Sequence, residues 1–274
     1  MKKILVATDF SNCARNAMEY AMELAKVLQL EICTIHAIGS TEGVNNNMYS
    51  ALYIEDYYKN KRQALKDWAK TFTDTEAFKN VPVSTVCEVG SVSSVITKYI
   101  DANPVELLVM GTMGSTGITG IFGSNANSMV EKTKTPTLII PLESKFSMNP
   151  IITIATDFSS HLSSEDINSL NEIIVASKAE KLNVLNIIEG SASWKTNEAG
   201  EENLRKLIDT TGVEFNYINE SNPIDGIMNF VISNKTDVLC LVKRHHNIVY
   251  RIFNRSTVNQ VMNRSIKAVL ILHE

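Results

Sequence analysis

Short, nearly continuous apolar runs alternate along this chain with longer segments in which apolar residues recur at helical spacing. The runs at 4–8 and 31–38 are typical of strands that are buried on both faces of a parallel sheet. Between them, Ala14, Ala17 and Ala21 lie on one face of a predicted helix. The alternation predicts an α/β protein in which helices cover both faces of the sheet.

The same pattern continues to the end of the chain. Strands are predicted at 4–8, 31–38, 83–89, 105–110 and 137–140, and again at 151–156, 182–188, 213–219, 237–242 and 268–272. Helices are predicted at about 12–28, 51–72, 92–102 and 124–134, and again at about 163–178, 200–211, 224–234 and 256–265. Ser11 directly precedes the first helix and is expected to cap it.

The first half of the chain is repeated in the second. The recurring segments are ILVATDFS at 4–11 with ITIATDFS at 152–159, VELLVMG at 105–111 with TDVLCLV at 236–242, and TLII at 137–140 with VLIL at 269–272. We therefore expect two domains of ordinary size, at 1–143 and 150–274, each able to bury its own core. The segment from Pro141 to Pro150 is the expected linker.

Composition narrows the classes of function. The net charge of −4 and the lack of a basic run give no reason to expect nucleic acid as a partner. Four widely spaced cysteines without a C-x-x-C pair support neither a zinc site nor a redox motif. The opening MKKILVATDF is expected to be a strand and not a signal peptide, and no apolar stretch is long enough to span a membrane. We expect a cytoplasmic protein.

Candidate chemistry lies where three predicted strands end. In an open parallel sheet, ligands bind at the carboxyl ends of the strands. The residues expected there are Ala7, Thr8 and Asp9 at the end of the first strand, His36 and Ala37 at the end of the second, and Met110 and Gly111 at the end of the fourth. Asp9 could accept a hydrogen bond from a ribose hydroxyl or an adenine amine. His36 is expected to be a packed histidine and not a catalytic group.

A glycine-rich loop follows the fourth strand. Gly111 and Gly114 allow positive φ and close approach of a ligand, while Gly123 and Ser124 begin a helix whose free N–H groups attract an anion. Ser124 and Asn125 can add side-chain donors, so a nucleotide triphosphate would fit this cradle. Glycine spacing by itself is a weak signal, because a loop can need glycine merely to turn. The loop is neither a P-loop, since Gly-Lys-Ser/Thr is absent, nor a dinucleotide fingerprint, since it follows the fourth strand.

The second copy lacks this loop. Val242, His245 and Arg255 stand where the first copy has glycines, although Asp157 and Ser256 are retained. We favour a degenerate copy that is kept for folding and pairing. The alternative is a pocket for a different anion, formed by the basic residues Lys243, Arg244, His245, Arg251 and Arg255. A metal site at His245 and His246 is disfavoured, because no third ligand accompanies them.

These segments together resemble the universal stress protein family in its tandem, two-domain form. The resemblance rests on ILVATDFS, EICTIHAI at 31–38, GSVSSVI at 90–96, GTMGSTGITGIFGSN at 111–125 and PTLIIP at 136–141. It implies an adenine nucleotide α hydrolase-like fold, with a five-stranded parallel sheet and about four helices in each domain. Many members of the family bind ATP.

The resemblance also implies which residues hold the nucleotide. The glycine pattern of the family falls on Gly111, Gly114, Gly123 and Ser124, and its adenosine contacts fall on Ala7, Thr8, Asp9 and Ala37. The expected cofactor is ATP or another adenine nucleotide, with Mg²⁺ as an accompanying ion. One departure concerns the loop: eight residues separate Gly114 from Gly123, where the family has nine. A shorter loop either tightens a surface turn or weakens triphosphate binding.

Three functions compete. The leading one is a regulatory protein that binds ATP and changes its contacts with an unknown protein partner under stress. The second is a nucleotide-free scaffold with both sites degenerate. The third is a slow ATPase, although no catalytic residue, Walker-type lysine or metal-binding acid is evident.

The last strand of each copy suggests how the domains associate. Family dimers pair through this strand, so Thr137–Ile140 is expected to pair with Val269–Leu272 and make one chain resemble a dimer. Pairing would also protect two apolar edge strands. Whether two chains assemble into a homodimer stays open.

Overall fold

The computed structural model describes residues 2–39, 50–112, 124–158, 162–188, 198–208, 212–243 and 255–274. Its N-terminal half contains β1 (Lys3–Ala7), α1 (Asn12–Leu28), β2 (Glu31–Ile38), α2 (Ser50–Thr73), β3 (Val83–Val89), α3 (Val92–Ala102), β4 (Val105–Gly111), α4 (Ser124–Lys132) and β5 (Thr137–Ile140). Its C-terminal half repeats the order with β6 (Ile151–Ala155), α5 (Ser164–Ser177), β7 (Lys181–Ile188), α6 (Glu198–Leu207), β8 (Val213–Asn219), α7 (Pro223–Ser233), β9 (Val238–Lys243), α8 (Arg255–Arg264) and β10 (Ala268–His273).

All ten strands form one sheet in the order β3-β2-β1-β4-β5-β10-β9-β6-β7-β8. Within each half, every neighbouring pair of strands is parallel. The halves meet at the single antiparallel pair, where Val269, Leu270 and Ile271 of β10 lie opposite Ile139, Leu138 and Thr137 of β5. The predicted fold class is confirmed, and so is the predicted pairing of the two last strands.

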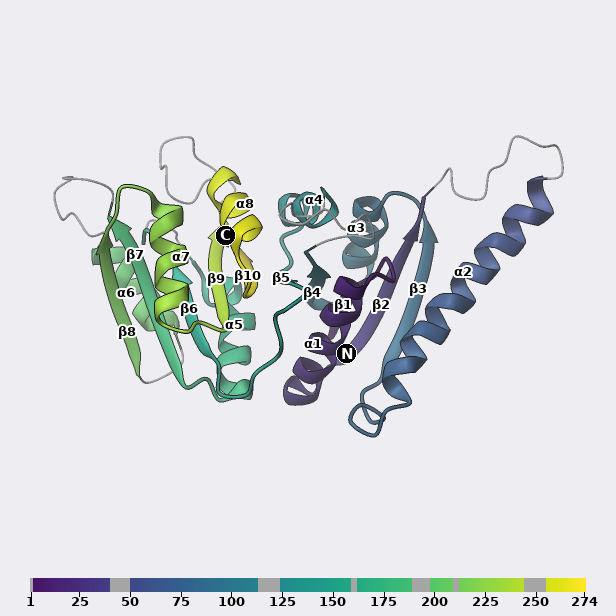
Figure 1. Cartoon of the computed structure of the whole chain (residues 1–274), viewed down its shortest axis with the longest axis horizontal. Coiled ribbons are helices and arrows are strands. Elements are labelled where there is room, and N and C mark those ends of the chain that lie inside the picture. Colours follow the sequence, from purple (N-terminus) through teal and green to yellow (C-terminus); the bar gives the residue numbers. More distant parts are fainter. Residues whose placement is uncertain are drawn as a thin grey trace.

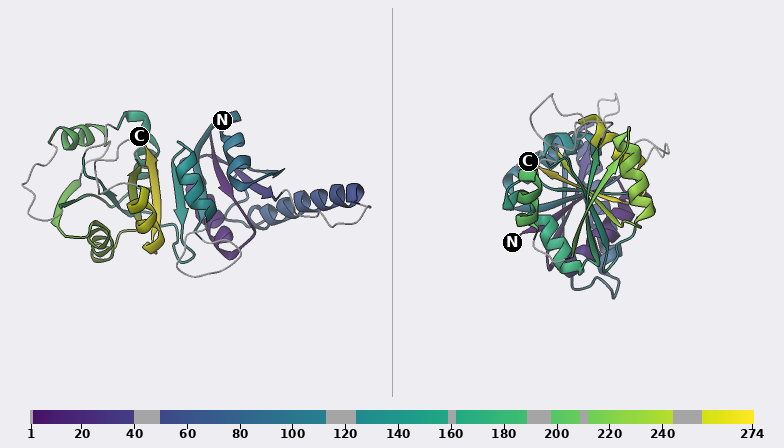
Figure 2. Two further views of the ribbon diagram at one scale, coloured as in Figure 1. Left: turned by 90° about the horizontal axis from the view of Figure 1, so that it is seen from above. Right: turned by 90° about the vertical axis from the view of Figure 1, so that its left-hand side faces the viewer.

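The sheet lies between two layers of helices (Figure 1). One face packs against α1, α2, α5 and α6 through residues such as Met18, Trp68, Leu170 and Leu204. The other face packs against α3, α4, α7 and α8. Both clusters contain residues from the two halves, so the cores continue across the β5–β10 pair. Seen end-on, the strands fan out, as expected when the twist of each pair accumulates over ten strands (Figure 2).

Serine side chains cap the first helix of each half, and the cap at Ser11 was predicted. The hydroxyl of Ser11 caps α1 by accepting a hydrogen bond from the N–H of Ala14 at 3.1 Å. In the second copy, Ser163 caps α5 and shares a capping box with Asp166. The two caps are not equivalent in the repeat, because Ser11 corresponds to Ser159, which lies four residues before Ser163.

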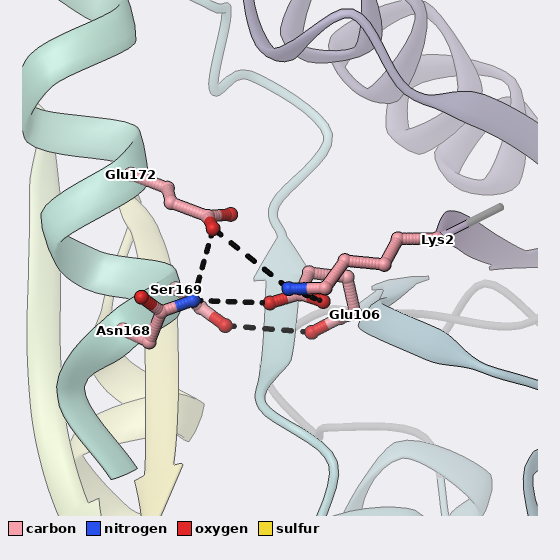
Figure 3. Close-up of polar contacts among 5 residues, drawn as sticks. All are labelled: Lys2, Glu106, Asn168, Ser169 and Glu172. Atoms are coloured by element: carbon pink, nitrogen blue, oxygen red, sulfur yellow. Dashed lines mark hydrogen bonds and ion pairs between the residues drawn. The ribbon is translucent and has the colours of Figure 1, made fainter. Parts of the chain in front are cut away.

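A polar cluster joins the halves beside the paired strands (Figure 3). The ammonium of Lys2 lies 2.9 Å from Glu106 of β4 and 3.9 Å from Glu172 of α5. The amide of Asn168 donates to the carboxylates of Glu106 at 3.4 Å and Glu172 at 2.9 Å, and the Ser169 hydroxyl donates to the carbonyl of Glu106 at 3.4 Å. The hydrogen bond to Glu106 raises the pKa of Lys2 above its ordinary value. The cluster therefore links α5 to the first half.

The segment predicted as a linker is a packed connection. The side-chain amide of Asn16 in α1 donates to the carbonyls of Pro141 and Ser144, both at 2.8 Å, and its oxygen accepts from Lys145 at 2.7 Å. The Ser144 hydroxyl in turn accepts from the N–H of Ala268 at the start of β10. The connection thus contacts both halves instead of acting as a free tether.

The four cysteines are free and buried, as is common for cysteines that act as small apolar side chains. Burial raises the pKa of the Cys240 thiol above its ordinary value. Among the helices within the described ranges, none combines the length and the apolar character needed to cross a membrane.

Candidate functional site

The structure brings the predicted strand ends together. Because β2, β1 and β4 are neighbours in the sheet, their carboxyl ends lie side by side at one edge. Ala7 and Met110 are buried on the sheet face that α4 covers, and the half-buried Ala37 packs against the same cluster.

A tight turn presents Asp9 at this edge. The N–H of Thr8 donates to the carbonyl of Ile35 at 3.0 Å, and the Thr8 hydroxyl accepts from the N–H of Phe10 at 3.0 Å. Phe10 has φ of 65°, a left-handed conformation that is rare for a bulky residue. Asp9 is exposed, and its carboxylate accepts from the N–H of Ser11 at 3.0 Å. The hydrogen bonds hold Asp9 in place at the cost of backbone strain, which is a common property of functional sites.

The second copy builds the same turn. Phe158 has φ of 56°, its N–H donates to the Thr156 hydroxyl at 3.0 Å, and the N–H of Thr156 donates to the carbonyl of Leu185 at 2.9 Å. The left-handed phenylalanine was not predicted from the sequence. The signal that could have revealed it is the repetition of TDFS directly after the first strand of both copies. A segment that both copies keep unchanged can hold a strained backbone conformation, which persists only where the surrounding structure enforces it.

A side chain from the second strand supports each turn. Nδ1 of His36, which is buried, donates to the carbonyl of Thr8 at 2.8 Å, and the ring packs against Phe10 with centroids 4.6 Å apart. In the second copy, the amide of Asn186 donates to the carbonyl of Thr156, also at 2.8 Å. The prediction that His36 is a packed histidine is confirmed. Its role is to support the turn that carries Asp9.

This equivalence predicts which substitutions at His36 are tolerated. We expect His36→Asn to lower the free energy of unfolding by less than about 1 kcal/mol, because asparagine makes the same contact at the equivalent position. His36→Leu leaves the Thr8 carbonyl without this donor, and we expect it to cost about 1–3 kcal/mol. Urea unfolding of both variants measures the difference. Equal stability of the two variants would show that the hydrogen bond does not support the turn.

Gly111 has a structural reason to be glycine. A Cβ built on it would lie 3.0 Å from the backbone carbon, the backbone oxygen and the sulfur of Cys13 in the first turn of α1. Next to it, the Thr112 hydroxyl lies 3.5 Å from the Cys13 thiol, and the N–H of Thr112 donates to the carbonyl of Ile140. The missing side chain thus lets α1 approach β4, whereas the sequence suggested that it made room for a ligand. This contact holds the first turn of α1, which follows Asp9 in the sequence, against the end of β4.

The helix that follows the glycine loop begins at the same edge. α4 starts at Ser124, and both Ser124 and Asn125 are exposed. The first N–H groups of a helix have no partner within it and carry a partial positive charge, so they can bind an anion. Gly114 and Gly123 lie outside the described residues. The proposed phosphate cradle is therefore described at its two ends, Gly111 and Ser124, and not along its loop.

The corresponding edge of the C-terminal half differs. α6 packs directly on the turn: a Cβ on Gly200 would lie 1.7 Å from the carbonyl oxygen of Phe158. Phe158 is buried and its ring packs near Phe215 and Tyr217. Asp157 is half-buried, whereas Asp9 is exposed. Of the basic residues considered for an anion pocket, Arg244, His245 and Arg251 lie outside the described residues, and Lys243 is buried.

Other candidate sites are distinct from this edge. A groove of 390 Å³ lies between α1, the end of α2 and the connection that follows β5. Its charged groups contact other groups of the protein: Arg15 lies over the Phe72 ring at 5.0 Å and Lys145 lies 3.5 Å from Glu19. Within the ranges that the structure describes, no three His, Cys, Asp or Glu side chains gather as metal ligands would.

Comparisons with known proteins agree with the fold and the motifs. A family model described as "Universal stress protein family" matches residues 1–141. Universal stress protein MJ0577 of Methanocaldococcus jannaschii is 24% identical over 152 residues, which cover 51% of this chain and 94% of that protein. Universal stress protein YxiE of Bacillus subtilis is 27% identical over 145 residues, which cover 50% of this chain and 97% of that protein.

A solved structure extends the likeness to the whole chain. The crystal structure of a universal stress protein from Archaeoglobus fulgidus superposes with a TM-score of 0.73, at 17% identity, and covers 98% of this chain and 97% of its own. At this identity the likeness shows the fold alone. The family model matches just over half of the chain, and the chain belongs to the universal stress protein family.

Proposed function

We propose that the N-terminal half binds an adenine nucleotide, ATP in preference to others, and that the chain acts as a nucleotide-dependent regulator of an unknown protein partner. The observation that carries this proposal is the asymmetry between the two copies. Asp9 is exposed at the edge of the sheet where α4 also begins, whereas Asp157 is half-buried and α6 packs directly on the carbonyl of Phe158. One nucleotide per chain is therefore expected.

Each residue of the site has a proposed part in binding. The Asp9 carboxylate accepts hydrogen bonds from the adenosine, while Ala7, Thr8 and Ala37 provide the edge of the sheet against which it lies. Met110 and Gly111 lead into the loop, and the phosphates bind at the glycines and at the N–H groups of Ser124 and Asn125. Mg²⁺ would accompany the triphosphate and offset part of its charge.

We do not assign catalysis to this site. Hydrolysis of ATP requires a group that positions the attacking water and cations that stabilise the transition state. Asp9, the acidic residue at the described edge, already accepts a hydrogen bond from the backbone of Ser11. At most a slow ATPase activity is expected.

We also propose the domain division at 1–143 and 150–274 and a place in the cytoplasm. The division is supported by the repeated order of the elements, with the connection between β5 and β6 falling between the two ranges. Four free cysteines are typical of a reducing compartment.

The repeat supplies a matched pair of variants to test the proposal. Denaturing freshly purified protein and identifying the released nucleotide by mass spectrometry should yield ATP at about one per chain. Asp9→Asn should then weaken ATP binding about 10–100-fold in calorimetric titration, because hydrogen bonds to charged groups contribute about 1.5–3 kcal/mol. Asp157→Asn, the same change at the equivalent position, should leave the affinity unchanged.

The shortened loop favours a second candidate, a nucleotide-free scaffold. If the loss of one residue between Gly114 and Gly123 has closed the phosphate site, purified protein will carry no nucleotide and will not bind it at millimolar ATP. That result would contradict the first proposal. Equal weakening by Asp9→Asn and Asp157→Asn would also contradict it, since the site would not be where we place it.

A further inference from the structure

A lysine of the C-terminal half reaches into the N-terminal half at the helix that begins the proposed phosphate site. Nζ of Lys243, at the end of β9, donates a hydrogen bond of 2.6 Å to the carbonyl of Val130 in α4. Lys243 is only 8% exposed, and Val130 is 1% exposed. The contact joins residues that are 113 positions apart in the sequence.

The antiparallel pair of strands explains how this contact arises. β10 runs antiparallel to β5, so the carboxyl ends of β9 and β10 lie at the edge of the sheet where β5 begins. α4 ends at Lys132, five residues before Thr137 opens β5. The last turn of α4 is therefore next to the end of β9, and β9 ends in Lys243.

The contact satisfies a group that the helix itself leaves open. The last four carbonyls of a helix have no partner within it, and Val130 is one of these in α4. A cation at this end also complements the negative end of the helix dipole. The other end of the same helix, about 12 Å away at 1.5 Å per residue, begins the proposed anion site. α4 thus connects that site to the C-terminal half.

The contact is not reciprocal. In the repeat, Gly111 and Thr112 correspond to Val242 and Lys243. Thr112 occupies the position of Lys243 in the first copy, but its short hydroxyl lies near Cys13 of its own half. The residue that follows the lost glycine in the second copy has therefore become a contact to the first copy.

We propose that Lys243 is a positioning residue for the phosphate end of the nucleotide site, acting through α4. This inference rests on the proposed function for its ligand. By holding the last turn of α4, Lys243 fixes the height and direction of the first turn, where Ser124 and Asn125 meet the phosphates. Adenosine lies against β1 and β2 and does not depend on α4 to the same degree.

The decisive experiment compares ATP with adenosine in wild type, Lys243→Met and Lys243→Arg. Methionine keeps most of the length of the side chain and removes the charge and the donors. We expect Lys243→Met to weaken ATP binding about 3–10-fold and to leave adenosine binding unchanged, because the helix dipole acts only on the phosphates. Lys243→Arg keeps the cation and should restore most of the ATP affinity. Lys267→Met, in the same half but after α8, is the control and should bind ATP as wild type does.

Hydrogen exchange gives a second readout that needs no nucleotide. In Lys243→Met, the amides of α4 should exchange faster than in wild type, while those of α8 should not change. If the wild type binds no ATP, the proposed function fails and the ligand part of this inference fails with it, and exchange in α4 alone decides whether Lys243 holds the helix. Unchanged ATP affinity in Lys243→Met, or equal weakening of ATP and adenosine, would overturn the inference.

Discussion

Replacing Leu270 by aspartate is expected to lower the free energy of unfolding by about 4 kcal/mol or more and to make the chain associate. Leu270 is fully buried in β10, opposite Leu138 of β5, and belongs to the core cluster that continues from one half into the other. A carboxylate at this position would be buried without water or a counterion to stabilise its charge. Loss of the pair also exposes the edge of β5, and an unpaired apolar edge promotes association between chains.

Urea unfolding and light scattering measure the two effects of Leu270→Asp. The control is Leu142→Asp, which places the same charge two residues after β5 on a side chain that is 42% exposed. We expect this control to remain within about 0.5 kcal/mol of wild type, as surface substitutions usually do. If both variants unfold at the wild-type midpoint, the strand pair cannot be what joins the halves in solution.

Substitution of Gly111 by valine is expected to lower the free energy of unfolding by about 3 kcal/mol and to abolish ATP binding. A Cβ at this position lies 3.0 Å from the backbone of Cys13, and backbone cannot move aside as the end of a side chain can. α1 must therefore shift away from β4. That shift separates the turn at Asp9 from the end of β4, and the proposed site needs both. The second copy carries Val242 at this position.

Gly226→Ala is the control for the replacement of a glycine by a larger residue. Gly226 lies inside α7, and a Cβ there would lie 2.9 Å from Cδ1 of Ile187, the far end of a side chain that can rotate. Alanine also favours a helix interior over glycine by about 1 kcal/mol, so this variant should be as stable as wild type. Thermal unfolding and ATP titration test both variants. If Gly111→Val binds ATP with the same affinity as wild type, the end of β4 does not belong to the nucleotide site.

The elements and their order could be predicted from the sequence because their signals are local. Apolar runs, helical spacing and caps such as Ser11 act within a few residues, and the strand at 31–38 and the helix at 12–28 agree with the structure at both ends. The repeat identified the matching segments at Asp9 and Asp157, and the resemblance to a family whose dimers pair through the last strand suggested the β5–β10 pair. The residues of the candidate site were named from the same motifs and from the resemblance to a family.

The tertiary structure decided what those residues contact, because the contacts join positions that are far apart in the chain. The sequence suggested that Gly111 lets a ligand approach, and the structure adds a packing reason, because a side chain there would meet the backbone of Cys13. The sequence offered Lys243 only as one member of an alternative anion pocket in its own copy, whereas Lys243 donates to a carbonyl at the end of α4 in the other copy. Neither contact can be predicted from a local pattern. The contact of Gly111 depends on how α1 packs on the sheet, and the contact of Lys243 depends on the antiparallel pairing of β5 and β10. Sequence alone therefore determined the elements and the repeat, and packing between distant segments determined the contacts that Gly111 and Lys243 make.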